Sequence, residues 1–221
     1  MKVGVLGAGS MGIGIAQIAA SFGHEVVLCD NNAASMERSI QGLTKILHRL
    51  VEKGRVTLEQ VNGMLGRIQQ TSLINEFNDC DIVIEAIVEN LDVKKSVFQK
   101  MEDVVSDTCI LATNTSTIPL EAISSALKQP GRLVGIHYFN PVAKMPLVEV
   151  VHGQNTAQRS IDCALKFVKD IGKLPLPVKR SPGFLVNRIL LPYMLEAVSL
   201  LEEGVAGPVI DKAAVAFGMP M

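Results

Sequence analysis

The chain has 221 residues, of which 48% are hydrophobic and 19% are charged. This is enough length and apolar material for one well-packed domain and a small appendage. The 21 Lys and Arg against 22 Asp and Glu give a formal net charge of -1. A balance this even excludes attraction to nucleic acid or acidic lipid by one broad charged field, so local groups must hold any anionic ligand.

The N-terminal residues MKVGVLGAGSMG carry one basic residue and then an apolar run that glycines interrupt, which is unlike a signal peptide. No stretch reaches membrane-spanning length without polar interruption. Four cysteines show no metal-ligand or paired spacing and are typical of reduced, buried thiols in an intracellular protein. We predict a cytoplasmic location, with the mitochondrial matrix as the less favoured alternative, and no metal site.

Short apolar runs rich in β-branched residues alternate with longer helical patterns along the chain. The predicted strands are 3–6, 25–28, 80–84, 109–112, 133–137, 147–151 and 174–178. The predicted helices between them are 11–22, 33–53, 91–105, 120–127 and 156–171. This alternation predicts an α/β fold with a doubly wound, mostly parallel sheet.

The segment GAGSMG follows the first predicted strand and opens the first helix. Gly7 permits a tight turn, Gly9 lets the backbone approach a pyrophosphate, and Gly12 allows close packing of helix on strand. The helix N-terminus near Met11 offers N–H groups and a positive dipole end to phosphates. This context favours a Rossmann-like dinucleotide site over a tight turn without a ligand.

Asp30 ends the second predicted strand, where a carboxylate can accept hydrogen bonds from the adenine ribose of NAD. The same charge would repel the 2′-phosphate of NADP, and neither Asn31 nor Asn32 could hold that phosphate as an arginine would. The cofactor prediction is therefore NAD. An aspartate that caps the following helix, with no ligand, is the open alternative.

His137 lies at the C-terminal end of a predicted strand, where open α/β sheets bind ligands. Glu149 follows inside the apolar segment PLVEVV, where an unpaired carboxylate would be costly to bury. Together they would make a base oriented by a carboxylate, suited to removing a hydroxyl proton while NAD accepts a hydride. A buried pair that only stabilises the fold is the alternative.

A domain boundary is predicted after residue 180, because Ser181 can cap a helix and Pro182 suits its first position. The helix expected from Phe184 to Glu203 is apolar nearly all round and needs partners on most faces. We therefore predict domains at 1–180 and 181–221, the second being the truncated start of an all-α domain.

Five segments, in order, resemble the 3-hydroxyacyl-CoA dehydrogenase family over essentially the whole chain: GAGSMGIGIA, EAIVENLDVK, ATNTS, HYFNPVAKMPLVEV and SPGFLVNRILLPYMLEA. The resemblance implies NAD-dependent oxidation of an L-3-hydroxyacyl-CoA to the 3-ketoacyl-CoA in fatty-acid β-oxidation. It also implies a Rossmann-like N-terminal domain and a helical C-terminal domain that completes the cleft and forms a homo-oligomer.

The resemblance also implies residue roles. His137 would be the general base, Glu149 would orient it, and Ser116 and Asn187 would hydrogen-bond the reacting oxygen. From local sequence alone, a helix cap is the simpler interpretation of Ser116 and its neighbours. The implied cofactor contacts are Gly7, Gly9, Met11, Gly12, Asp30, Glu89, Lys94, Ser116 and Asn140.

Without the resemblance, Glu89 and Lys94 would be interpreted as a solvated charge pair near a helix start. For the acyl-CoA substrate, the resemblance implies contacts from Lys53 and Ser116. The helix that ends near Lys53 is basic enough for a nucleotide phosphate, although such charges more often form a solvated face.

Three alternatives remain open. The first is a 3-hydroxybutyryl-CoA dehydrogenase of the same family, and the second is a catalytically silent NAD-binding module. The third concerns architecture: KRSPGFLVNRILLPYMLEA and IDKAAVAFGMPM are more similar to multifunctional fatty-acid oxidation α subunits, which would add a thiolase partner, than to the monofunctional enzyme.

Overall fold

A computed structural model describes residues 1–219, and the chain divides after Arg180 into two compact units. The first unit contains an eight-stranded sheet in the order β3-β2-β1-β4-β5-β6-β7-β8. Its strands are β1 (Lys2–Leu6), β2 (Glu25–Cys29), β3 (Ile68–Thr71), β4 (Ile82–Glu85), β5 (Ile110–Thr113), β6 (Leu133–Tyr138), β7 (Leu147–His152) and β8 (Leu174–Lys179).

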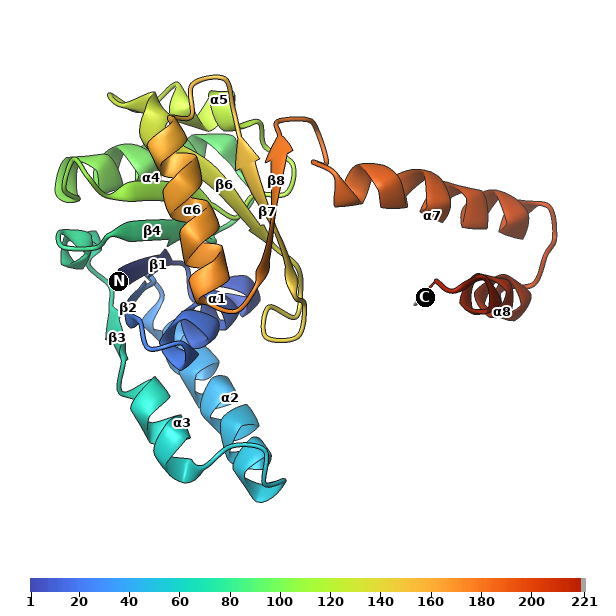
Figure 1. The fold of residues 1–221 in the computed structure, drawn as a ribbon, viewed down its shortest axis with the longest axis horizontal. Helices are drawn as coiled ribbons and strands as arrows, with labels where there is room; N and C mark the ends of the chain where they lie inside the picture. The colour runs from blue at the N-terminus through green and yellow to red at the C-terminus, as the bar shows by residue number, and fades with distance from the viewer. Residues whose placement is uncertain (220–221) are drawn as a thin grey trace. The chain divides into compact units, whose positions relative to one another are not determined.

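The helices of the first unit connect these strands (Figure 1). They are α1 (Ser10–Ser21), α2 (Ala33–Glu52), α3 (Leu58–Leu65), α4 (Leu91–Val104), α5 (Leu120–Ser124) and α6 (Gln158–Asp170), with short 3₁₀ turns at Ile74–Phe77 and Pro130–Arg132. All neighbouring strands are parallel except β6 and β7, which are antiparallel. The Rossmann-like, mostly parallel α/β fold predicted from the sequence is confirmed, because the first six strands follow the doubly wound order.

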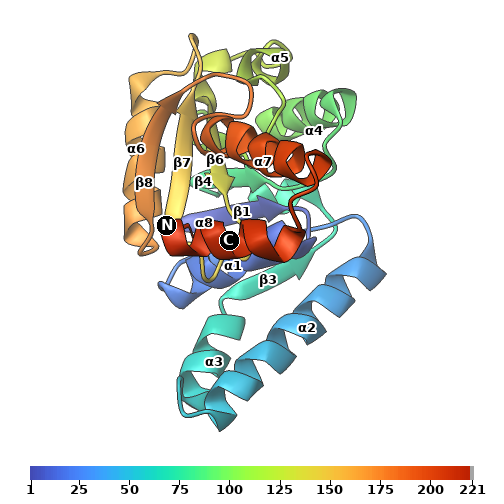
Figure 2. The same cartoon turned by 90° about the vertical axis from the view of Figure 1, so that its right-hand side faces the viewer.

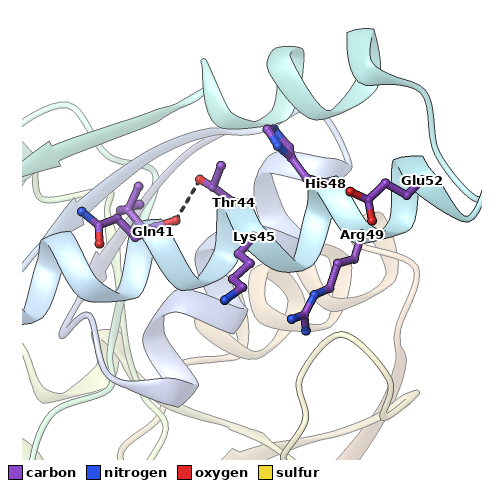
Figure 3. Close-up of a pocket in the computed structure, with 7 residues that line it drawn as sticks. Gln41, Thr44, Lys45, His48, Arg49 and Glu52 are labelled. Atoms are coloured by element: carbon purple, nitrogen blue, oxygen red, sulfur yellow. Dashed lines mark hydrogen bonds between the residues drawn. The ribbon is translucent and has the colours of Figure 1, made fainter.

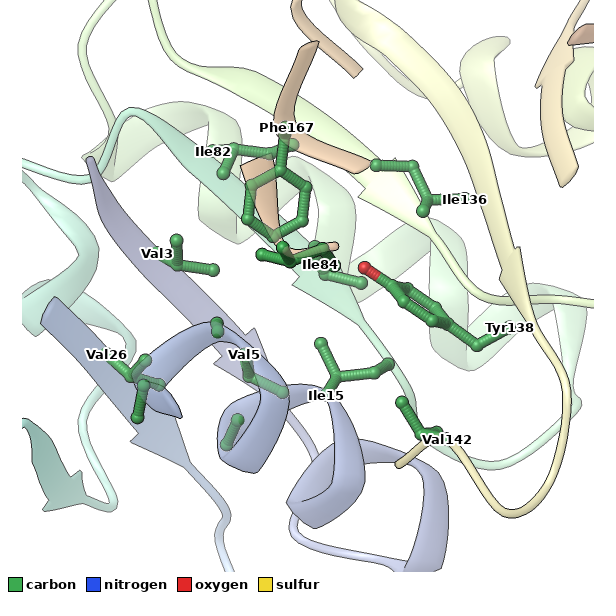
Figure 4. Close-up of a cluster of buried hydrophobic side chains, with 14 of the residues drawn as sticks. Val3, Val5, Ile15, Val26, Ile82, Ile84, Ile136, Tyr138, Val142 and Phe167 are labelled. Carbon is green, nitrogen blue, oxygen red and sulfur yellow. The ribbon is translucent and has the colours of Figure 1, made fainter. Parts of the chain in front are cut away.

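The core of the first unit forms where alternate strand residues meet α1 and α6 (Figure 4). Val5 of β1, Ile84 of β4 and Ile136 of β6 lie there with Ile15 and Phe167 of the two helices, all fully buried. The intervening strand residues point to the opposite face. Figures 1 and 2 show that α2 and α3 pair and extend away from the sheet as a helical arm.

One buried hydroxyl in this core has no hydrogen-bond partner among the described residues, that of Tyr138. Burial also raises the pKa of Tyr138, so it stays neutral. Because an unpaired buried hydroxyl costs desolvation energy, Tyr138→Phe should raise the free energy of unfolding by about 1 kcal/mol or leave it unchanged. Denaturant unfolding curves measure this difference. A loss of more than about 1 kcal/mol would show that the hydroxyl has a partner.

The sequence patterns missed α3 and β3, and they overextended α5 to residue 127. β3 carries one buried apolar residue, Ile68, so no strand periodicity marks it. α3 does have a readable start, since Thr57 and Gln60 form a capping box in which each side chain accepts from the other's backbone N–H.

The second unit contains α7 (Val186–Glu202) and α8 (Gly207–Phe217), which contact each other. The prediction that Ser181 caps this helix and Pro182 begins it is wrong. Gly183 and Phe184 both have positive φ, 75° and 50°, so the helix cannot run through them, and its N-cap is Leu185. α7 has no buried residue and contains Pro192.

The cysteines are free thiols, with Cys29, Cys80 and Cys109 buried and Cys163 half-buried. Burial raises the pKa of Cys29 to about 11 and that of Cys80 to about 12, so these thiols are protonated and unreactive. In the described part of the chain, no helix combines the length and apolar character needed to cross a membrane.

Candidate active site

The glycine loop connects β1 to α1 at the centre of the sheet. Gly7 has φ 103°, and a Cβ atom there would lie 2.5 Å from the carbonyl oxygen of Ala86 in the loop after β4. A Cβ atom on Gly12 would lie 1.8 Å from the Gly7 carbonyl oxygen, so Gly12 serves the packing of α1 on β1. Gly9 faces open space, which leaves room for a ligand against the backbone.

Asp30 is held beside this loop. Its Oδ2 accepts from Ala8 N at 2.7 Å and its Oδ1 accepts from Asn32 N at 2.8 Å. Asn32, whose side chain accepts from Ser35 N, is the N-cap of α2. The alternative in which Asp30 caps the helix is therefore wrong, and its carboxylate keeps lone pairs for ligand hydroxyls.

A cavity of about 790 Å³ lies at this point, where the order of strands reverses between β1 and β4. The cavity is lined by Gly7, Gly9, Met11 and Asp30, which were all predicted from the sequence as cofactor contacts. The first N–H groups of α1 have no partner within the helix, so this end of the cavity suits a pyrophosphate. The further lining residues include Ser72, Ile74, Ile87, Val88, Val93, Val97 and Lys100, which the sequence had not indicated. The cavity therefore fits a dinucleotide.

His137 and Glu149 face each other across the antiparallel pair β6–β7. The His137 Nδ1 atom lies 2.7 Å from Glu149 Oε2, and both side chains are buried, with Glu149 0% exposed. An ionised carboxylate only accepts hydrogen bonds, so beside Glu149 the Nδ1 atom carries the hydrogen, and a neutral imidazole then has its lone pair on Nε2. Phe139 packs edge-on against the imidazole at 4.7 Å between ring centroids.

A buried charge network lies at the ends of β4 and β5. The Lys94 ammonium is 1% exposed and contacts Glu85 Oε1 at 2.5 Å and Glu89 Oε2 at 3.2 Å. Glu85, fully buried, also accepts from Ile87 N and from the Thr113 hydroxyl. The interpretation of Glu89 and Lys94 as a solvated pair is therefore wrong, because the main partner of Lys94 is a buried carboxylate.

Glu89 lies at the exposed edge of this network. Burial raises its pKa, but hydrogen bonds from Thr115, Lys94 and Thr117 and the Lys94 charge together hold that pKa below its usual value. The carboxylate is thus kept ionised. The Lys94 ammonium is enclosed, and neither Lys94 nor Glu89 lines the dinucleotide cavity.

Ser116 and Asn140 lie in the loops after β5 and β6, at the same edge of the sheet. The segment before Ser116 does not cap α5, whose N-cap is Pro119. It connects the loop after β5 to the end of β6 instead, because the Asn114 side-chain oxygen accepts from Tyr138 N at 2.9 Å. Ser116 is half-buried, and Asn140 is exposed.

Two predicted residues belong to other parts of the molecule. Asn187 is the second residue of α7, in the second unit. Lys53 is the C-cap of α2, at the end of the helical arm, and does not line the dinucleotide cavity. A second pocket of about 490 Å³ runs along α2, where Lys45 and Arg49 project to one side of the helix (Figure 3).

Sequence reasoning missed Glu85, although a signal was present. Glu85 follows the apolar run IVI at a strand end, and a buried carboxylate requires a polar or cationic partner, as for Glu149. The other missed contacts come from α4 and from the segments after β3 and β4, whose approach to the cavity depends on tertiary packing.

The sheet order, the glycine loop with its acidic partner, and the cavity between them together define a dinucleotide-binding domain. The family description "3-hydroxyacyl-CoA dehydrogenase, NAD binding domain" matches residues 2–181, and "3-hydroxyacyl-CoA dehydrogenase, C-terminal domain" matches residues 183–221. The chain belongs to the 3-hydroxyacyl-CoA dehydrogenase family, and its first unit is the NAD-binding domain of that family.

Relatives of two kinds are similar to this chain. It is 41% identical over 220 residues to the fatty acid oxidation complex subunit alpha of Psychrobacter cryohalolentis, covering 100% of this chain and 31% of that protein. It is 41% identical over 219 residues to a probable 3-hydroxybutyryl-CoA dehydrogenase of Deinococcus radiodurans, covering 99% of this chain and 78% of that protein. The crystal structure of FadB2 from M. tuberculosis has a TM-score of 0.96 at 38% identity, covering 99% of this chain and 78% of that chain.

Proposed function

We propose that the protein oxidises an L-3-hydroxyacyl-CoA to the 3-ketoacyl-CoA as a step of fatty-acid β-oxidation. The observation that carries this proposal is the buried His137–Glu149 pair, with 2.7 Å between Nδ1 and Oε2, at the ligand-binding edge of a sheet with an NAD-type cavity. A base held in one orientation by a carboxylate is what removal of a hydroxyl proton requires. A catalytically silent NAD-binding module would not require a histidine held in one orientation by a buried carboxylate.

In this reaction, His137 takes the proton of the 3-hydroxyl group through Nε2, and Glu149 stabilises the imidazolium that forms. NAD, when bound, supplies the acceptor for the hydride that leaves the substrate carbon. Ser116 hydrogen-bonds the reacting oxygen and favours the carbonyl geometry of the product. Glu89, kept ionised by Thr115 and Lys94, lines the nicotinamide side together with Asn140.

The CoA part of the substrate would be held by the helical arm. The pocket along α2 contains Lys45, His48 and Arg49, and the first and last of these lie one turn apart on one side (Figure 3). Cations at this spacing suit a nucleotide phosphate. We place Lys53, at the end of the same helix, among the CoA contacts, with Ser116 at the reactive end of the substrate.

Asp30 gives a direct test of the cofactor assignment. We expect Asp30→Ala to weaken NAD binding by roughly 10- to 150-fold, because hydrogen bonds to a charged group are worth about 1.5–3 kcal/mol. NADP binding should weaken less, because the variant also removes a repulsive charge. Titration calorimetry with both cofactors measures the two dissociation constants, and Asp162→Ala on the surface of α6 serves as the matched control. Equal affinity of the unmodified protein for both cofactors would refute the assignment.

A second candidate is a 3-hydroxybutyryl-CoA dehydrogenase, as the D. radiodurans relative is named. The two functions share their chemistry and differ in acyl-chain length. Rates measured with a series of L-3-hydroxyacyl-CoA substrates of increasing chain length separate them. A maximum at four carbons supports the second candidate, and a maximum at longer chains supports the first.

The partners expected for this protein depend on which of the two candidate functions is correct. The relative named as the alpha subunit of a fatty acid oxidation complex supports a multifunctional assembly, in which the implied partner is a thiolase. We also propose a homo-oligomer, for which α7 provides support because Ile189, Leu191, Met194 and Leu195 on it are each more than half exposed. Sedimentation velocity of the protein alone and with a thiolase distinguishes these assemblies.

A further inference from the structure

Lys173 is a buried lysine to which the proposed chemistry assigns no role. It precedes β8 and is 7% exposed. Its Nζ atom lies 2.6 Å from the Val142 carbonyl oxygen and 2.8 Å from the Met145 carbonyl oxygen. Among the described residues, the hydrogen-bond partners of its ammonium group are these two backbone carbonyls. Desolvation by burial lowers the pKa of Lys173. An ammonium buried in this way is costly, so a contribution to fold stability alone explains it poorly.

The two carbonyls belong to the turn between β6 and β7, which carries one end of each catalytic strand. Within the turn, the N–H groups of Lys144 and Met145 both donate to the Pro141 carbonyl oxygen. The Lys173 ammonium therefore lies where a single helical turn ends and its carbonyls lack partners. Leu174 N donates to the Pro146 carbonyl oxygen at 2.8 Å and fixes the other end of the turn.

The same turn contacts the cofactor-binding helix. Val142 is 3% exposed, and a Cβ atom on Gly14 of α1 would lie 2.9 Å from the Val142 Cβ. Figure 4 shows Val142 beside Ile15 and Tyr138 in the core. Any outward shift of the turn would thus remove a close contact from the first turns of α1. The turn also begins directly after Asn140, a proposed contact on the nicotinamide side.

We propose that Lys173 is a positioning residue for the cofactor: its ammonium fixes the β6–β7 turn, so that Val142 holds α1 and Asn140 keeps its place at the cleft. The register of His137 opposite Glu149 depends on the same turn, because the turn sets how the two antiparallel strands pair. Lys173 touches neither cofactor nor substrate in this role. The proposal rests on the proposed function in assuming that NAD occupies the cavity beside α1.

The test compares NAD binding and turn mobility in four variants. Lys173→Met removes the ammonium, and Lys173→Arg retains a cation that can donate to two carbonyls. Lys169→Met makes the same chemical change at an exposed site on α6. Val142→Ala keeps both acceptor carbonyls but removes the two Val142 methyl groups beside Gly14, so it weakens this contact and tests the coupling even if Lys173→Met fails to fold. Titration calorimetry gives the NAD dissociation constant, and hydrogen exchange at the Lys144 and Met145 amides reports on the turn.

We expect Lys173→Met to weaken NAD binding by roughly 2- to 30-fold and to accelerate exchange at both amides. Val142→Ala should weaken NAD binding with little effect on exchange. Lys173→Arg should recover part of the affinity, and Lys169→Met should match the unmodified protein. Unchanged NAD affinity in Lys173→Met or, where that variant does not fold, in Val142→Ala would overturn the proposal. If the unmodified protein itself does not bind NAD, the proposed function fails instead.

Discussion

Replacing His137 with glutamine should lower kcat for oxidation of an L-3-hydroxyacyl-CoA by roughly 10²–10⁴-fold, the usual contribution of a general base. The glutamine amide can still donate a hydrogen bond to Glu149, so the buried carboxylate keeps a partner. NAD affinity should stay near that of the unmodified protein, because His137 does not line the dinucleotide cavity. Steady-state kinetics and a parallel NAD titration measure both quantities.

His152 offers a matched control, since it lies at the end of β7 and is half-buried. His152→Gln should retain nearly full turnover. Glu149→Gln should lower kcat as well, because the imidazolium formed during the reaction loses its stabilising charge. Near-normal turnover by His137→Gln would show that another group removes the proton.

Replacing Lys94 with methionine should lower the free energy of unfolding by about 3–5 kcal/mol, the typical cost of breaking a buried ion pair by removing one partner. In this variant the fully buried Glu85 carboxylate keeps two hydrogen-bond donors, Ile87 N and the Thr113 hydroxyl, but loses its cationic partner. Lys95→Met, at the adjacent half-buried position, is the control and should change stability little. Denaturant unfolding monitored by circular dichroism gives the values.

A double variant separates the loss of the ion pair from the loss of side-chain packing. Glu85→Gln combined with Lys94→Met removes both charges, so no uncompensated charge remains buried. It should therefore be more stable than Lys94→Met alone. If the double variant were the less stable of the two, unpaired charge would not be the cause of the loss.

The sequence was sufficient to predict parts of the site where the physical requirement at a position admits one residue type or demands one kind of partner. Gly7 needs a positive φ and Gly12 tolerates no Cβ, and both requirements are visible from a glycine motif after a strand. Glu149 in an apolar strand demanded a partner, and His137 was the one found in register with it. These inferences depend on local spacing and on the high cost of burying charge.

Local spacing was insufficient where tertiary packing decides the environment. From its local sequence, Lys94 is predicted to be a surface residue near a helix start. It is enclosed because β4 and β5 approach that helix in the folded domain. The start of α7 was misplaced because Ser181 and Pro182 are good helix-start residues, whereas the positive φ of Phe184, a non-glycine residue, has no sequence signature. The contribution of α4 and of the segment after β3 to the cavity could not be predicted from their sequences, because it depends on tertiary packing.

The antiparallel β6–β7 connection makes the acid–base pair a local feature of the chain, because His137 and Glu149 are 12 positions apart. The dinucleotide cavity instead draws on residues from Leu6 to Lys100. The pair therefore has low contact order and needs only a short loop closure to form, whereas the cavity needs several long-range crossovers. One short segment of chain accordingly supplies the pair, whereas the cavity is complete only when the crossovers from β1 to α4 have formed.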